Sequence, residues 1–220
     1  MVTEKFKDAL QDYYFLLNRD YAEKPAVKLV GDRYRLSSVE RLILYRGVTS
    51  GKKAPARKAK LSADLKGKKL YIDGYNVLFT IKNYLLGRPV FLANDGFMRD
   101  CGEVYGKVEN ETFFFRAVDL LLEYLCGCGV SAVEVFFDSP TSGSENHAGE
   151  VEKRLAAVGT AGEVFLVKYA DRELRKKKDG VIATSDSEII DAVDCPAADL
   201  AREVLETNFG INLLDLGKLL

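Results

Sequence analysis

The spacing of apolar residues predicts helices within the first 48 positions. In "EKFKDALQDYYFLLN", residues 4–18, large apolar side chains recur every three or four positions, which is the period of an amphipathic helix. These side chains are Phe6, Leu10, Tyr13, Tyr14 and Leu17. A second helix is expected within "RLSSVERLILYRGV", residues 35–48, where Ser37 and Glu40 form a capping box and Gly47 can end the helix. The intervening "AVKLVGDRYRL" predicts a turn or a short hairpin.

From residue 68 the pattern changes to short apolar runs that alternate with helical stretches. The runs expected to contain strands are "KLYIDGYNVLF" (69–79), "SAVEVFFDSP" (131–140), "EVFLVKYA" (163–170), "GVIATSD" (180–186) and "INLLDL" (211–216). The first strand is expected to end at Asp73, and the second at Asp138. Helices are expected over residues 110–129, 144–159, 171–178 and 197–210. Strands that alternate with helices predict an α/β fold whose mainly parallel sheet is covered by helices on both faces.

The two patterns divide the chain into three parts. Residues 1–48 are expected to be a small helical N-terminal region, and residues 68–220 an α/β domain. The segment between them, "TSGKKAPARKAKLSADLKG" (49–67), has few large apolar residues and predicts a basic linker. Two short helices bury little apolar surface by themselves, so the N-terminal helices are expected to pack on something larger.

Composition narrows the choice of protein class. Apolar residues make up 47% of the 220, which is normal for a globular protein with a full core. No apolar run approaches the roughly 20 residues that span a bilayer, so no membrane partner is expected. The charged N-terminal stretch does not have the pattern of a signal peptide, which makes the cytoplasm the expected location.

The reactive side chains favour carboxylates for any catalytic role. The spacing of Cys101, Cys126, Cys128 and Cys195 matches no zinc pattern, and His147 is the only histidine. Cys126 and Cys128 end an expected helix and are interpreted as small buried residues.

The net charge of −1 gives no overall attraction for nucleic acid, but residues 52–60 and 172–178 are strongly basic.

An aspartate follows each of the four clearest strands. These residues are Asp73, Asp138, Asp171 and Asp186. Ligands of parallel α/β sheets bind beyond the carboxyl ends of the strands, so the four acids are expected to meet at one edge. Clustered carboxylates repel one another, and Mg²⁺ or Mn²⁺ with oxygen ligands would relieve that repulsion. The alternative is that each acid only caps the following helix.

Four motifs in this order resemble the PIN-like nucleases, specifically their NYN branch. They are "YIDGYNVL", "VFFDSP", "YADREL" and "ATSDSEIID", and the resemblance covers about residues 68–220. The residues before them resemble the small helical N-terminal region of uncharacterised archaeal and bacterial proteins that carry this domain. The resemblance implies a three-layer α/β/α sandwich and a divalent-metal-dependent ribonuclease.

The resemblance also implies roles for individual residues. Asp73, Asp138, Asp171 and Asp186 match the family's catalytic and metal-binding acids. The supporting positions are Asn76, Thr184 and Ser185, with Glu188 and Asp191 as weaker candidates beyond them. RNA phosphates would be held by Lys52, Lys53, Arg57, Lys58, Arg154, Arg172, Arg175 and Lys176.

Several alternatives stay open at this point. One is a PIN-like module that binds RNA or a protein without cutting. A phosphotransferase of the haloacid dehalogenase type is discounted, because Tyr75 stands where that class needs its second acid. Residues 82–110 exceed the family's usual first crossover. A flap over the site, an RNA-contacting loop, a homodimer contact and an ordered surface insertion are the roles considered for them.

Overall fold

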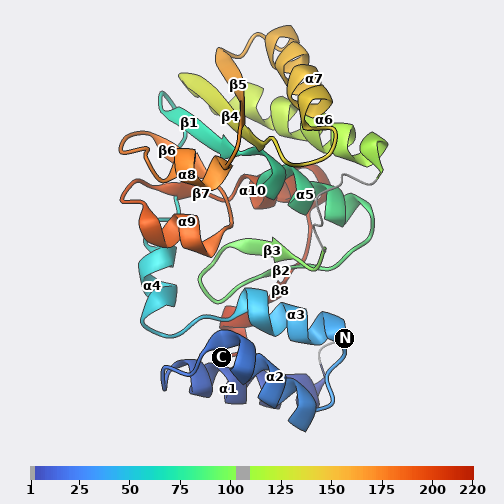
Figure 1. Cartoon of the computed structure of the whole chain (residues 1–220), viewed down its shortest axis with the longest axis vertical. Coiled ribbons are helices and arrows are strands. Elements are labelled where there is room, and N and C mark those ends of the chain that lie inside the picture. The colour runs from blue at the N-terminus through green and yellow to red at the C-terminus, as the bar shows by residue number, and fades with distance from the viewer. Residues whose placement is uncertain (1–2, 103–109) are drawn as a thin grey trace. The chain divides into compact units, whose positions relative to one another are not determined.

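A computed structural model of the chain describes residues 3–102 and 110–220 (Figure 1). The chain forms two compact units, and each of them combines segments that are distant in sequence. The first unit consists of Met1–Ala59, Pro89–Cys101 and Asn212–Leu220. The second consists of Lys60–Arg88 and Gly102–Ile211. The division therefore differs from the three consecutive parts expected from the sequence, since residues 89–101 and 212–220 join the N-terminal helices.

The first unit is built from four helices and a small sheet. The helices are α1 (Glu4–Leu17), α2 (Glu23–Arg33), α3 (Ser38–Gly47) and α4 (Lys53–Lys58). The strands are β2 (Val90–Leu92), β3 (Met98–Asp100) and β8 (Leu214–Asp215), followed by a 3₁₀ turn at Leu216–Lys218. Strand β2 is central, antiparallel to β3 and parallel to β8. The last predicted strand thus exists, but it belongs to this small sheet.

The helical predictions for the first unit are partly confirmed. The capping box of Ser37 and Glu40 is formed in both directions at the start of α3. The expected hairpin before it is wrong, because residues 23–33 form helix α2. Ala26 and Val30 lie four positions apart on that helix, and both are buried in the core it shares with α1 and α3. The helices do pack on something larger, since Phe91 and Leu216 join this core.

The predicted linker is also ordered in part. Lys53–Lys58 form α4, and Arg57 from this helix is buried at 5% exposure. Its guanidinium nitrogen lies 3.2 Å from Asp95 Oδ2, and Arg99 holds both oxygens of the same carboxylate at 2.9 and 2.8 Å. A buried carboxylate that binds two arginines stabilises this part of the first unit, and therefore residues 53–58 do not behave as a linker.

The second unit has a five-stranded, fully parallel sheet in the order β5-β4-β1-β6-β7. The strands are β1 (Lys69–Asp73), β4 (Ala132–Asp138), β5 (Gly162–Val167), β6 (Val181–Ala183) and β7 (Ala197–Ala198). The helices are α5 (Gly74–Leu85), α6 (Glu111–Cys128), α7 (Ser144–Ala157), α8 (Ala170–Leu174), α9 (Ser187–Ala192) and α10 (Leu200–Phe209). The predicted α/β sandwich with a parallel sheet is confirmed.

Helices cover both faces of this sheet. Tyr71, Phe136 and Ile182 point to one face, where they share a core with residues of α8 and α9. Successive strand residues face opposite sides, so Leu70 and Ile72 point to the other face. Helix α5 packs against β1 and β4 and contacts α6 and α10 (Figure 1).

The first strand ends at Asp73, as expected. Helix α5 begins directly after it, at Gly74. Val77, Leu78 and Ile81 are buried at helical spacing, so the same apolar run satisfies a helix. A Cβ on Gly74 would lie 2.9 Å from the Phe136 carbonyl oxygen, which explains why glycine stands at this close approach.

Two further expectations concern exposure. Cys126 is exposed and Cys128 is half-buried, so the interpretation of both as buried residues is wrong. Across residues 3–102 and 110–220, no helix combines the length and the apolar character needed to cross a bilayer.

The segment 82–110, for which a flap, an RNA-contacting loop, a homodimer contact and a surface insertion were considered, includes residues 103–109, which lie outside the described part of the chain.

Candidate functional site

The order of the strands places a crevice beside β1. The chain passes from β1 outward through β4 to β5, and then returns to the other side of β1 for β6 and β7. Connections on the two sides of β1 therefore diverge above its carboxyl end. Parallel α/β sheets bind ligands at such a switch point.

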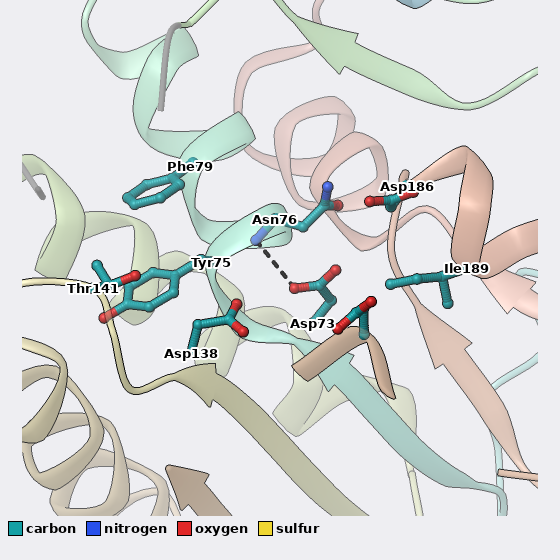
Figure 2. Close-up of a pocket in the computed structure, with 9 residues that line it drawn as sticks. Asp73, Tyr75, Asn76, Phe79, Asp138, Thr141, Asp186 and Ile189 are labelled. Carbon is teal, nitrogen blue, oxygen red and sulfur yellow. Dashed lines mark hydrogen bonds between the residues drawn. The ribbon is translucent and has the colours of Figure 1, made fainter. Parts of the chain in front are cut away.

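A hollow of about 370 Å³ lies at this position (Figure 2). Its lining residues are Asp73, Tyr75, Asn76, Phe79, Asp138, Thr141, Asp171, Asp186 and Ile189. The structure thus brings all four predicted aspartates to one hollow. Among the described residues that line it there is no lysine, arginine or histidine.

Asp73 forms the floor of the hollow at the end of β1. Its Oδ1 accepts a long hydrogen bond of 3.5 Å from the backbone N of Asn76, which caps helix α5 (Figure 2). Its Oδ2 accepts a hydrogen bond from Thr184 Oγ1 at 2.9 Å. Asp73 is therefore a helix cap, as the alternative interpretation held, and it is also a buried carboxylate of the hollow.

The loop after β6 is tied to the start of α5. The side-chain oxygen of Asn76 accepts hydrogen bonds from the backbone N and the hydroxyl of Ser185, at 2.8 and 3.0 Å. The hydroxyl of Thr184 accepts from the backbone N of Asp186 at 3.1 Å. Thus Thr184 and Asn76, both expected to support the site, fix the position from which Asp186 enters it.

Asp138 and Asp171 enter from the other side of β1. Asp138 ends β4, and its Oδ1 accepts a hydrogen bond of 2.8 Å from the backbone N of Ala170. Asp171 follows Ala170 in the first turn of α8. One backbone contact therefore orients the Asp138 carboxylate and holds the segment that carries Asp171.

The lining of the hollow is acidic, with four carboxylates and no basic side chain among its described residues, and Arg175 lies 3.8 Å from one of the four, Asp171. Burial, together with repulsion from Asp186 and Asp138, raises the pKa of Asp73 to about 7, against a lowering by the Thr184 hydrogen bond. Burial and the neighbouring Asp171 likewise raise the pKa of Asp138, although the Ala170 hydrogen bond opposes them. An added positive charge would relieve the part of these shifts that comes from repulsion between the carboxylates.

The fit to a divalent cation is good in chemistry but incomplete in geometry. Carboxylate oxygens are the ligands that Mg²⁺ and Mn²⁺ prefer, and the raised pKa of Asp73 is caused mainly by burial and in part by repulsion from Asp186 and Asp138. Among the described residues, however, no three acidic, histidine or cysteine side chains are grouped closely enough to hold one ion. An ion here would be held by few carboxylates, with water or substrate supplying the other ligands.

The two weaker acidic candidates do not line the hollow. Glu188 is exposed, and its carboxylate lies 3.1 Å from Arg175. Its backbone N donates to Asp186 Oδ1 at 2.7 Å, so residue 188 contributes through its main chain. Asp191 is exposed on α9.

The expected phosphate contacts have different surroundings. In the first unit Lys52, Lys53 and Lys58 are exposed, whereas Arg57 is buried against Asp95 and is not available to a phosphate at the surface. In the second unit, Arg154 pairs with Asp119, Arg175 with Glu188 and Asp171, and Lys176 with Glu173. Arg172 is exposed and stacks on Tyr169.

Sequence reasoning missed the aromatic wall of the hollow. Tyr75 packs against Phe79, with ring centroids 5.1 Å apart, and its hydroxyl lies 3.0 Å from Nδ1 of the fully buried His147. Burial lowers the pKa of His147, so the single histidine is a neutral partner of Tyr75 outside the lining. The signal was the four-residue spacing of Tyr75 and Phe79, which places both on one side of a helix.

Comparisons with known proteins give relatives without a stated activity. A family model described as a domain of unknown function (DUF5616) matches residues 62–203, and one described as a protein of unknown function (DUF434) matches residues 5–60. "Uncharacterized protein MJ0935" of Methanocaldococcus jannaschii is 37% identical over 201 residues, which cover 90% of this chain and 95% of that protein. No solved structure gives a significant match.

Proposed function

The chain belongs to the family described as a domain of unknown function (DUF5616), and we propose that the hollow, whose four acids all lie within the matched residues, is the active site of a metal-dependent ribonuclease. The observation that supports the proposal most is the convergence of four carboxylates from four strand ends on one hollow that has no basic lining. Carboxylates held close together repel one another and destabilise a fold, and a bound cation would relieve that repulsion.

The choice of RNA as substrate rests on the resemblance of the four motifs to PIN-like nucleases of the NYN type. In this proposal Mg²⁺ or Mn²⁺ would be held by carboxylates from the set Asp73, Asp138, Asp171 and Asp186, with water or substrate supplying the other ligands. When bound, the ion would lower the pKa of a water molecule and stabilise the charge that develops on the phosphate.

The chain's own residues would prepare the ligands. The hydroxyl of Thr184 fixes one oxygen of Asp73, and the backbone N of Ala170 fixes one oxygen of Asp138. Asn76 holds the loop that carries Asp186. Hydrogen bonds of this kind orient carboxylates before a ligand arrives, which reduces the entropy lost on binding.

The test is cleavage of labelled RNA with Mg²⁺ or Mn²⁺. We expect cleavage by the wild-type protein, none in EDTA, and a loss of about a hundredfold or more in Asp73→Asn and in Asp186→Asn. The matched control is Asp194→Asn, because Asp194 is an exposed aspartate of the same unit outside the hollow. A wild-type protein that cleaves no RNA with either ion, or cleavage that survives both substitutions, would overturn the proposal.

One observation favours a second candidate, a PIN-like module that binds RNA or a protein without cutting. Among the described residues, the acids of the hollow do not form a group of three that could hold a metal ion. In that case the wild-type protein would bind RNA or a protein partner, and Asp73→Asn and Asp186→Asn would bind it equally well. The same set of variants therefore separates the two candidates.

A further inference from the structure

An exposed tyrosine lies beside two cationic side chains next to the hollow. Tyr169 is 41% exposed at the turn between β5 and α8. The guanidinium carbon of Arg172 lies 4.4 Å from the centroid of its ring, and Lys168 Nζ lies 5.4 Å from it. We call these three residues the Tyr169 platform.

The two cations of the platform differ from Arg175, Lys176 and Lys177, the three that directly follow α8. Arg175, Lys176 and Lys177 each lie within 4 Å of a carboxylate. Within the described ranges, 3–102 and 110–220, neither Lys168 nor Arg172 has a carboxylate that close, and the ring is the contact they share. Their charge is therefore available to an anionic ligand, which ion-paired residues could bind only by losing a partner.

The platform is fixed to the hollow by the residues between its members. Ala170 is buried and donates its backbone N to Asp138, and Asp171 lines the hollow. Leu174 is buried in the core beneath α8. Ala170 and Leu174 therefore anchor the segment that carries the exposed Tyr169. A ligand on Tyr169 would be held beside Asp138 and Asp171.

From these contacts we infer that the Tyr169 platform binds an unpaired base and the adjoining phosphate of single-stranded RNA beside the hollow. An aromatic ring next to arginine and lysine is the combination that binds single strands, because bases stack on the ring and phosphates pair with the cations. A base inside a duplex is already stacked and paired, so it cannot reach a ring held in this way. The acids of the hollow repel phosphates, and nearby unpaired cations offset that repulsion.

This inference rests on the proposed function, since it names the substrate form of the same site. Its test measures binding and cleavage separately. The probe is a fluorescein-labelled single-stranded RNA of about 12 nucleotides, a length within the range that such sites cover, and its anisotropy is measured in EDTA. The same sequence as a duplex is the second probe.

Four proteins are compared in addition to wild type. Tyr169→Ala removes the ring of the platform, and Arg172→Ala removes one of its two cations. Tyr169→Phe keeps the ring. The control, Phe209→Ala, removes an aromatic side chain of similar exposure, 43%, elsewhere in the unit. We expect Tyr169→Ala and Arg172→Ala to bind the single strand about tenfold more weakly, the effect of losing one stacked base. Tyr169→Phe and Phe209→Ala should stay within about twofold of wild type. Duplex binding should change little in any variant.

The inference is overturned if Tyr169→Ala binds the single strand as tightly as wild type, or if its loss is equal for strand and duplex. It is also overturned if wild type binds no single strand, or if Phe209→Ala loses as much as Tyr169→Ala. Binding that depends on Tyr169 in a protein that cleaves no RNA would retain the platform and reject the ribonuclease. Cleavage with binding indifferent to Tyr169 would do the reverse.

Discussion

Replacing Asp73 by asparagine is expected to stabilise the metal-free protein above neutral pH. Asp73 is 8% exposed, whereas Asp138, Asp171 and Asp186 are half-buried. Burial is the main reason that its pKa rises from 3.8 to about 7. An asparagine has almost the same shape and carries no charge, so it removes the cost of ionising this position.

The protons bound by the folded and unfolded protein determine whether Asp73 stabilises or destabilises the fold at a given pH. Between pH 3.8 and about 7 the folded protein keeps the Asp73 proton that the unfolded chain has lost, so stability falls as the pH rises through this range. The difference of about three pKa units corresponds to about 4 kcal/mol above pH 7. The amide of asparagine cannot accept as well from both Thr184 and Asn76, which subtracts about 1 kcal/mol. A net gain of about 3 kcal/mol is expected for Asp73→Asn above pH 8, with little gain or a small loss near pH 4.

The assay is urea denaturation in EDTA at several pH values between 4.5 and 9, a range chosen to span the pKa of about 7. The quantity of interest is the free energy of unfolding of the variant minus that of wild type, because the titration of groups that do not interact with Asp73 then cancels. Asp194→Asn is the control, since it removes an exposed aspartate of the same unit and should give no such pH dependence.

The reasoning about Asp73 would be refuted by a variant-minus-wild-type difference that is equal at both ends of this pH range. Adding Mn²⁺ to the same samples extends the test. A cation bound in the hollow stabilises only a protein that keeps its carboxylates, so the melting temperature of wild type should rise at pH 8 more than that of Asp73→Asn. Equal rises in the two proteins would count against Asp73 as a ligand.

Three further predictions concern contacts elsewhere in the two units. Thr184→Val removes the hydrogen bond that lowers the pKa of Asp73 and should destabilise the protein by about 1 kcal/mol at pH 8, with Thr184→Ser close to wild type in the same urea assay. Asp95→Ala removes the carboxylate shared by two buried arginines and should cost about 3–5 kcal/mol by urea denaturation; unchanged stability would mean that these ion pairs do not hold the first unit. Leu216→Ala should cost about 2–5 kcal/mol in calorimetry, because Leu216 is fully buried in the core of the N-terminal helices; a much smaller loss would mean that residues 212–220 are dispensable there.

The central strands of the parallel sheet were predictable because they are largely buried on both faces. A run such as "LYI" before Asp73 has no polar face, and it differs clearly from the helical stretches. Parallel pairing then brings the carboxyl ends to one edge, which is why four acids distant in sequence could be expected together. The contacts between them were not predictable. The hydrogen bond from Thr184 to Asp73 depends on the backbone geometry of two loops 111 residues apart.

The errors lie mainly in the first unit. Residues 23–33 form helix α2 where a turn or short hairpin was expected, because Ala26 and Val30 are buried only through the core that this helix shares with α1 and α3. The small sheet of the first unit consists of strands of two or three residues, which are too short to show any period. Its central strand β2 pairs with β8 across more than half of the chain. Pairing over that separation is decided by packing, and no local pattern indicates it.

The discontinuity of the first unit has a consequence for the order in which the protein is made. A ribosome releases residues 1–59 first, but Phe91 and Leu216 complete their core, and Leu216 follows the entire parallel sheet. The N-terminal helices therefore cannot complete their packing, and part of their apolar surface stays exposed, until the second unit has been synthesised. Expressing only residues 62–203, the span matched by one family model, would separate Phe91 from that core. We therefore expect that span alone to be prone to aggregation, and recombinant work on the sheet is best done on the whole chain.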